Sequence, residues 1–118
     1  MRIAVIDGQG GGIGRLIVEK LRQDLGHKCT ILALGTNAMA TSVMLKAGAN
    51  EGASGENAVV FSSDRVDVIT GSVAILAANS YSGELTPRMA EAIASSKAVK
   101  VLIPLNRCGI NICGLVDE

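Results

Sequence analysis

Five of the seven residues from 8 to 14 are glycine, in the segment GQGGGIG. The apolar run RIAVID at 2–7 precedes this glycine loop and is typical of a strand buried on both faces. After the loop, apolar side chains recur at helical spacing until Gly26, a typical helix end. A strand, a glycine loop and a helix in this order indicate an α/β fold with a phosphate-binding turn.

The rest of the chain continues the alternation of strands and helices. A helix is predicted after Thr36 or Asn37 as N-cap, ending at Gly48, and another begins at Thr86 with Pro87 in its first position. The segment 51–57 is predicted to be a loop, and 73–84 is compatible with either a short helix or an ordered loop. The predicted strands cover residues 2–7, 28–34, 58–62, 66–70, 99–105 and, after a turn at 106–109, residues 110–116.

These elements predict a Rossmann-like three-layer sandwich formed by one domain that spans residues 1–118. Right-handed crossovers give a mostly parallel sheet of about six strands in an order near 3-2-1-4-5-6. The last strand is expected to be antiparallel to its neighbour.

Composition excludes several classes of function. Lys plus Arg equal Asp plus Glu at 11 each, so a partner that attracts a basic surface, such as nucleic acid or a membrane, is not expected. The chain has three cysteines without a CxxC spacing and a single histidine, His27, a supply too poor for a metal site. Because no signal peptide or long apolar segment is found, we expect a cytoplasmic protein.

The glycine spacing distinguishes three classes of nucleotide-binding loop. A phosphate loop of triphosphatases requires Lys and Ser or Thr where Arg15 and Leu16 stand, and the methyltransferase pattern is broken by Gln9. Gly8, Gly12 and Gly14 fit the pattern GxxxGxG of dinucleotide-binding folds. The sequence therefore predicts a phosphate or pyrophosphate at this loop, with a turn that serves packing alone as the alternative.

The segment GIGRLIVEKL at 12–21 resembles the opening of short-chain dehydrogenases, over about the first 26 residues only. Two features of that family are missing. The second predicted strand is followed by Thr36 and Asn37 in place of the acidic residue that binds a ribose. The single tyrosine, Tyr81, has Leu85 where the family's Tyr-x-x-x-Lys pair requires lysine, so a short-chain dehydrogenase is not supported.

Ligands of such sheets bind at the carboxyl ends of the strands. Asp7, which ends the first strand, is a weak candidate for a catalytic carboxylate. The alternative is that it caps nearby N–H groups in an Asp-Gly turn. The predicted cofactor-binding residues are Asp7, Gly8, Gln9, Gly10, Gly11, Gly12, Ile13, Gly14, Thr36, Asn37, Gly71 and Ser72.

Six segments together resemble a family of short prokaryotic proteins of unknown function. They are IDGQGGGIG, ALGTNAMAT, MLKAGAN, SGENAVV, GELTPRMAEAI and LIPLN, and the likeness covers nearly the whole chain. The resemblance implies a small Rossmann-like fold and no established activity.

The sequence thus predicts a protein that binds or senses a nucleotide or dinucleotide, with NAD or NADP as the candidate cofactor. Apolar surface on the Ala- and Met-rich helix predicted between Thr36 or Asn37 and Gly48 suggests a homo-oligomer. Two alternatives stay open. One is a small oxidoreductase whose active site is completed by a partner subunit, and the other is a structural or interaction protein that kept the fold without a ligand.

Overall fold

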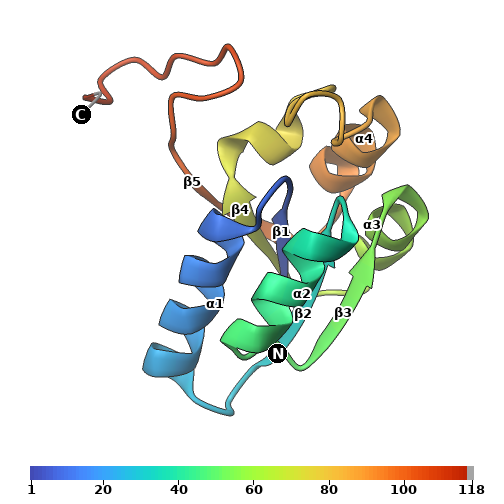
Figure 1. Cartoon of the computed structure of the whole chain (residues 1–118), viewed down its shortest axis with the longest axis vertical. Coiled ribbons are helices and arrows are strands. Elements are labelled where there is room, and N and C mark those ends of the chain that lie inside the picture. Colours follow the sequence, from blue (N-terminus) through green and yellow to red (C-terminus); the bar gives the residue numbers. More distant parts are fainter. Residues whose placement is uncertain (117–118) are drawn as a thin grey trace.

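A computed structural model, which describes residues 1–116, shows one parallel sheet of five strands between two layers of helices (Figure 1). The strand order is β3-β2-β1-β4-β5, as predicted for the first five strands. The strands are β1 (Arg2–Asp7), β2 (Thr30–Gly35), β3 (Glu51–Ser54), β4 (Val68–Ser72) and β5 (Val99–Ile103). The helices are α1 (Gly12–Leu25), α2 (Ala38–Ala47), α3 (Glu56–Ser62), the 3₁₀ helix η1 (Val73–Leu76) and α4 (Pro87–Ser95).

The two helical layers follow from the direction in which the chain crosses the sheet. The chain moves from β1 to β2 to β3 in one direction, so right-handed crossovers place α1 and α2 on the same face. It then returns to β4 and β5 on the other side of β1, which places α3 and α4 on the opposite face. Alternate residues of β1 serve the two cores: Ile3 and Val5 pack with α1 and α2, and Ala4 and Ile6 pack with α3 and α4.

The helix ends predicted from the sequence are confirmed. Gly26 and Gly48 are the C-caps of α1 and α2. The Asn37 side chain accepts a hydrogen bond from the amide of Ala40 and so is the N-cap of α2. Thr86 caps α4, with Pro87 at its start.

The prediction for residues 51–62 was wrong. It placed a loop before the third strand, whereas the structure has the strand first and then a helix. The expected loop contains β3, and the expected strand 58–62 lies in α3. β3 is a short edge strand with little burial, so it lacks the apolar run that marks an interior strand. In α3, Val59 and Ser62 are buried while Phe61 is exposed, which is a helical and not an alternating pattern.

The predicted sixth strand at 110–116 was also wrong, and with it the antiparallel pair. The fifth strand ends at Ile103, before Pro104. Beyond it, the C-terminal arm (residues 104–116) forms turns in which the amide of Ile110 donates to the Arg107 carbonyl and Cys108 has a positive φ of 54°. Positive φ values break the extended conformation that strand pairing requires. The segment 73–84, ambiguous in the sequence, forms η1 and then a series of turns.

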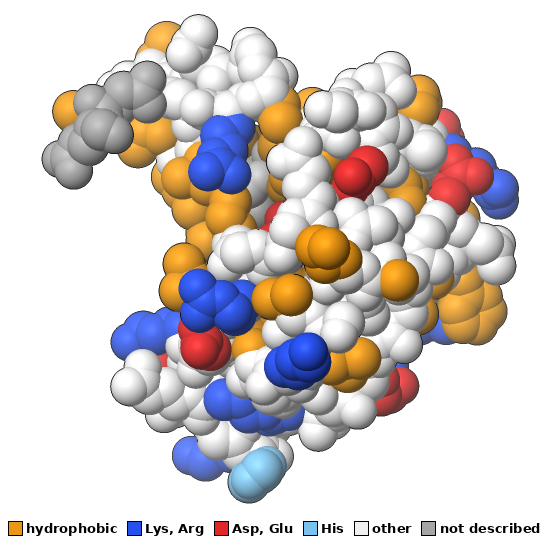
Figure 2. Space-filling view, viewed as in Figure 1, with side chains coloured by type: hydrophobic (Ala, Val, Ile, Leu, Met, Phe, Trp, Pro, Cys, Tyr) orange, Lys and Arg blue, Asp and Glu red, His pale blue; other side chains and the backbone are white. Residues whose placement is uncertain are grey.

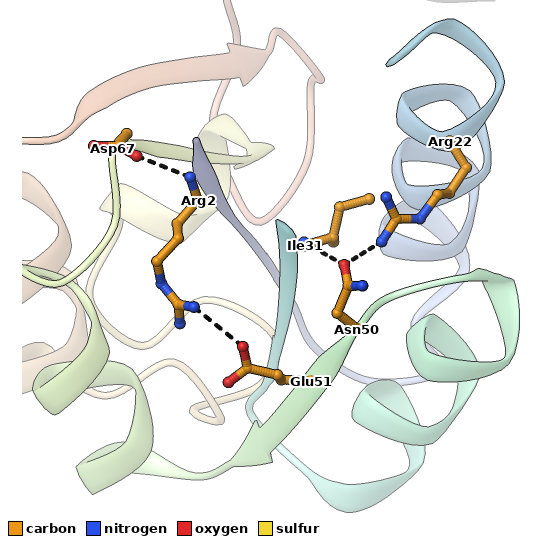
Figure 3. A network of polar contacts seen from close by, with 6 residues as sticks. All are labelled: Arg2, Arg22, Ile31, Asn50, Glu51 and Asp67. Atoms are coloured by element: carbon orange, nitrogen blue, oxygen red, sulfur yellow. Dashed lines mark hydrogen bonds and ion pairs between the residues drawn. The ribbon is translucent and has the colours of Figure 1, made fainter. Parts of the chain in front are cut away.

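A polar network ties the strands together at their amino ends, far from the glycine loop (Figure 3). The backbone amide of Arg2 donates to Asp67, 2.8 Å away, and its guanidinium pairs with Glu51 at 3.1 Å. Asn50 joins Arg22 of α1 to the start of β2. This network fixes the sheet at one end and leaves the carboxyl ends of the strands open for a site. No helix in residues 1–116 is long and apolar enough to cross a membrane.

Candidate functional site

A pocket of about 320 Å³ opens at the carboxyl end of β1, against the start of α1. Its wall is formed mainly by the glycine loop, with two arginines supplied by α1 and the C-terminal arm. The lining residues are Asp7, Gly8, Gln9, Gly10, Gly11, Gly12, Ile13, Arg15, Leu16, Tyr81 and Arg107. The structure therefore gathers most of the predicted loop residues around one concavity, which we call the glycine-loop pocket.

Asp7 is buried, with 3% of its surface exposed, and its carboxylate organises the loop. Its Oδ1 accepts the amide of Gly8 at 2.8 Å, and its Oδ2 accepts the amide of Gly14 at 2.7 Å. Burial raises the pKa of Asp7, while these amides and the nearby Arg107 oppose the rise. These two bonds correspond to the capping role that we gave as the alternative to catalysis.

Three glycines of the loop are required by the packing of the chain on itself. Gly8 is buried under the loop that carries Tyr81. At Gly11, which has a positive φ of 74°, a Cβ would lie 2.9 Å from a Cα atom of α2. At Gly14 a Cβ would lie 2.5 Å from the sulfur of Met44. These positions explain the close approach of α1 to the sheet and to α2.

Gly10 and Gly12 behave differently. A Cβ at either position would meet no atom within 4 Å, and neither φ is in the left-handed region. Both residues are exposed and line the glycine-loop pocket. Their amides donate to no atom of residues 1–116. Packing within the described chain therefore does not account for glycine at these two positions.

The end of β2 carries a carboxylate that the local sequence does not show. Oε1 of Glu84 accepts hydrogen bonds from the Thr36 hydroxyl at 2.6 Å, from the amide of Gln9 at 2.8 Å and from the Asn37 side chain at 2.9 Å. These bonds lower the pKa of Glu84, first through Thr36 and then through Gln9. Thr36 and Asn37 thus lie beside the glycine loop but outside the pocket wall, where they hold Glu84.

Gly71 and Ser72 do not line the pocket. The buried Ser72 hydroxyl is 2.9 Å from the Tyr81 hydroxyl, and burial raises the pKa of Tyr81. A Cβ at Gly71 would lie 2.6 Å from the carbonyl oxygen of Ile6, so this glycine is explained by the spacing of β4 and β1. Ser72 thus reaches the pocket only through Tyr81, and Gly71 belongs to the contact between β4 and β1.

The cofactor-binding residues predicted from the sequence did not include Tyr81, Glu84, Arg15 or Arg107. All but Arg15 are far from residues 8–14 in the chain, and no local motif connects them with the loop. The signal in the sequence for a carboxylate such as Glu84 was the neutral polar pair Thr36 and Asn37, because polar side chains at a strand end need hydrogen-bond partners. Residues 1–116 contain no cluster of three or more His, Cys, Asp or Glu side chains that could hold a metal ion.

Comparison with known proteins gives one match. The model of a family described as Domain of unknown function (DUF3842) matches residues 2–118. No curated protein and no solved structure matches the chain.

Proposed function

Since the chain belongs to the DUF3842 family, whose function is not known, we propose a function from the site itself: the protein binds a nucleotide or dinucleotide at the glycine-loop pocket. Its role is binding or sensing, and NAD is the candidate ligand. This proposal retains the resemblance of residues 12–21 to the opening of short-chain dehydrogenases.

The observation that carries the proposal is the open space at Gly10 and Gly12. A ligand that approaches the backbone closely requires glycine at such positions even when the protein's own packing does not. The two free amides lie at the start of α1, where the helix dipole favours an anion. Arg15 and Arg107 line the same pocket and add two positive charges for a phosphate group.

Glu84 supports NAD over NADP. In dinucleotide-binding folds, a carboxylate at the end of the second strand binds the ribose hydroxyls and repels a 2′-phosphate. Glu84 supplies a carboxylate at this place from a different loop, held by Thr36 and Asn37. Glu84 thus takes the place of the acidic residue that the sequence lacks directly after β2.

This arrangement makes a prediction about selectivity. The change Glu84→Gln keeps the size of the side chain and removes its charge, so NADP is expected to gain about five- to tenfold in affinity relative to NAD. Titration calorimetry with both dinucleotides measures the ratio. The matched control is Glu91→Gln on the exposed side of α4, which should leave the ratio unchanged. An unchanged ratio in Glu84→Gln would place the ribose elsewhere.

The site favours binding over the oxidoreductase alternative. Leu85, at the position where the Tyr-x-x-x-Lys pair needs lysine, is fully buried. The Tyr81 hydroxyl contacts Ser72, and burial raises its pKa although Arg107 opposes the rise, so it is a poor proton donor at neutral pH. An enzyme at this pocket would therefore need groups from a partner subunit.

The proposal is tested by a thermal-shift and calorimetry screen of NAD, NADH, NADP, NADPH, FAD, ATP, AMP and S-adenosylmethionine. We expect NAD or NADH to raise the Tm, since a ligand at 100 times its Kd adds about 2.7 kcal/mol to the free energy of unfolding. Loss of absorbance at 340 nm from bound NADH, with a candidate substrate present, would favour the oxidoreductase. A flat response to all eight compounds would favour the protein without a ligand.

Binding should also depend on pH. The Asp7 carboxylate borders the pocket, and an anionic ligand raises its pKa further because like charges repel. Proton uptake therefore accompanies binding, and the affinity for NAD, whose diphosphate stays charged, is expected to increase as the pH falls through the raised pKa of Asp7. Calorimetry in two buffers of different ionisation enthalpy measures the uptake. In Asp7→Asn the uptake should vanish; if it persists, another group titrates.

A further inference from the structure

One face of the sheet is left without cover at β5. Leu102 packs against the core under α3 and α4, so Val99, Val101 and Ile103, which alternate with it, face the α1 side. Within the described chain no helix follows β5, and the C-terminal arm leaves the body at this point (Figure 1). Val99 and Val101 are consequently 63% and 58% exposed.

This uncovered strand face continues into an apolar groove beside α1. The groove has a volume of about 250 Å³ and lies between Ile103 and the side chains of Leu16, Ile17 and Leu21. Hydrophobic side chains gather at the left of Figure 2, where the molecule is hollowed between α1 and the C-terminal arm. We call the whole area the β5 surface; it consists of Leu16, Ile17, Leu21, Val99, Val101 and Ile103.

The two edges of the sheet differ in a way that points to association at β5. β3, the other edge, has four residues and begins with Glu51, whose carboxylate pairs with Arg2. Short strands and charged side chains are means by which proteins keep sheet edges from pairing. β5 presents β-branched apolar side chains instead, and the ammonium group of its single charged residue, Lys100, is bonded to carbonyls of its own chain.

We infer that a second copy of this chain docks on the β5 surface. Leu16 lines the groove and is still 58% exposed, so two copies related by a two-fold axis can each pack Leu16 against the groove of the other. The rim of the groove carries one cation and one anion, Lys20 and Asp24, which lie 3.4 Å apart and pair with each other within the chain. A two-fold arrangement joins the pairs of the two copies into a network of four charges across the interface.

The net charge of the chain is compatible with a second copy as the docked partner. With 11 basic and 11 acidic residues, two copies do not repel each other through net charge. The rim of the groove has no excess of either charge that would favour a strongly acidic or basic partner. The inference differs from the expectation from the sequence, which placed association on the helix at 38–47. In the structure α2 buries Ala40, Thr41 and Met44 and leaves only Met39 and Leu45 as exposed large apolar side chains.

The docked copy also borders the proposed ligand site, because Leu16 lines both the groove and the glycine-loop pocket. The inference itself does not depend on the proposed function, since the β5 surface exists with or without a ligand.

Sedimentation equilibrium of the full chain without nucleotide tests the inference. We expect a dimer in the wild type. The change Val101→Lys places a charge at the middle of the β5 surface on an exposed position, and it should weaken the dimer at least about tenfold without changing the circular dichroism spectrum. The control Met39→Lys, at a position 66% exposed on α2, should remain dimeric.

A charge reversal provides a second test that does not alter apolar contacts. Lys20→Glu breaks the pair with Asp24 in each chain and adds repulsion by the partner's Asp24, so it should weaken the dimer, and adding Asp24→Lys should restore it. A wild type that stays monomeric throughout the concentration range would overturn the inference. A dimer that is lost in Met39→Lys but not in Val101→Lys would also overturn it and would place the interface on α2. A dimer that survives both changes would overturn it as well.

Discussion

Gly12→Val is expected to abolish ligand binding and to leave the fold intact. Gly12 is the first residue of α1 and faces open space, so the Cβ of a valine there meets no atom within 4 Å and the helical backbone accepts the residue. Its methyl groups instead occupy the side of the loop where a phosphate would approach the free amides. We expect the Kd for NAD to rise at least about 100-fold, which corresponds to about 2.7 kcal/mol of binding free energy.

The measurement is titration calorimetry with NAD, together with the Tm of each variant in the absence of ligand. Ala38→Val is the matched control, since Ala38 is the exposed first residue of α2 just as Gly12 is of α1. The control should bind NAD like the wild type. Undiminished binding in Gly12→Val would show that the ligand site lies elsewhere in the protein, and a Tm far below that of the control would show that Gly12 is needed for folding.

The parts of the fold that could be predicted from the sequence are those with a strong local cause. β1 and β4 are buried on both faces, and their apolar runs are visible in the sequence. Helix ends at Gly26, Gly48 and Thr86 follow from residue types with specific backbone or capping roles. The direction of every crossover follows from the handedness rule once the strands are known.

The errors fall where burial is partial or where distant contacts decide. β3 lies at an edge, so four residues with one half-buried side chain carried no strand signal. The segment INICGLV in the arm beyond Ile103 is rich in apolar residues, but positive φ values at Cys108, Gly109 and Gly114 turn the arm repeatedly. No local pattern encodes these turns strongly enough to outweigh the apolar composition.

The candidate site, like the fold, has a part that the sequence predicts and a part that it does not. The glycine loop could be located because a single continuous segment forms it, and the cap by Asp7 was among the alternatives. The carboxylate at β2 could not be located, because Glu84 reaches Thr36 across 48 positions of the chain. Spacing alone also could not separate glycines needed for packing from those that face open space, since both kinds alternate within residues 8–14.

Gly35→Ala is expected to lower the stability of the protein more than an alanine substitution at any loop glycine that faces the pocket. Gly35 ends β2 beneath the first turn of α2, and a Cβ there would lie 2.6 Å from the carbonyl oxygen of Asn37 and 2.7 Å from the amide nitrogen of Thr41. Backbone atoms cannot rotate away, so the start of α2 must move and the hydrogen bond from the Gly35 amide to the Thr41 hydroxyl, 3.1 Å long, is strained. Overpacking of this kind costs about 1–3 kcal/mol.

We expect the Tm of Gly35→Ala to fall by roughly 5–15 °C in thermal unfolding followed by circular dichroism. The control is Gly10→Ala, whose Cβ meets nothing, and its Tm should match that of the wild type. Adding Thr41→Ala to Gly35→Ala removes the contact of the new Cβ with the hydroxyl but not the two backbone contacts, so it should restore little stability. Full rescue by Thr41→Ala would mean that the backbone of α2 yields easily. In that case Asn37, which caps α2 and holds Glu84, would not be a rigid support for the carboxylate at β2.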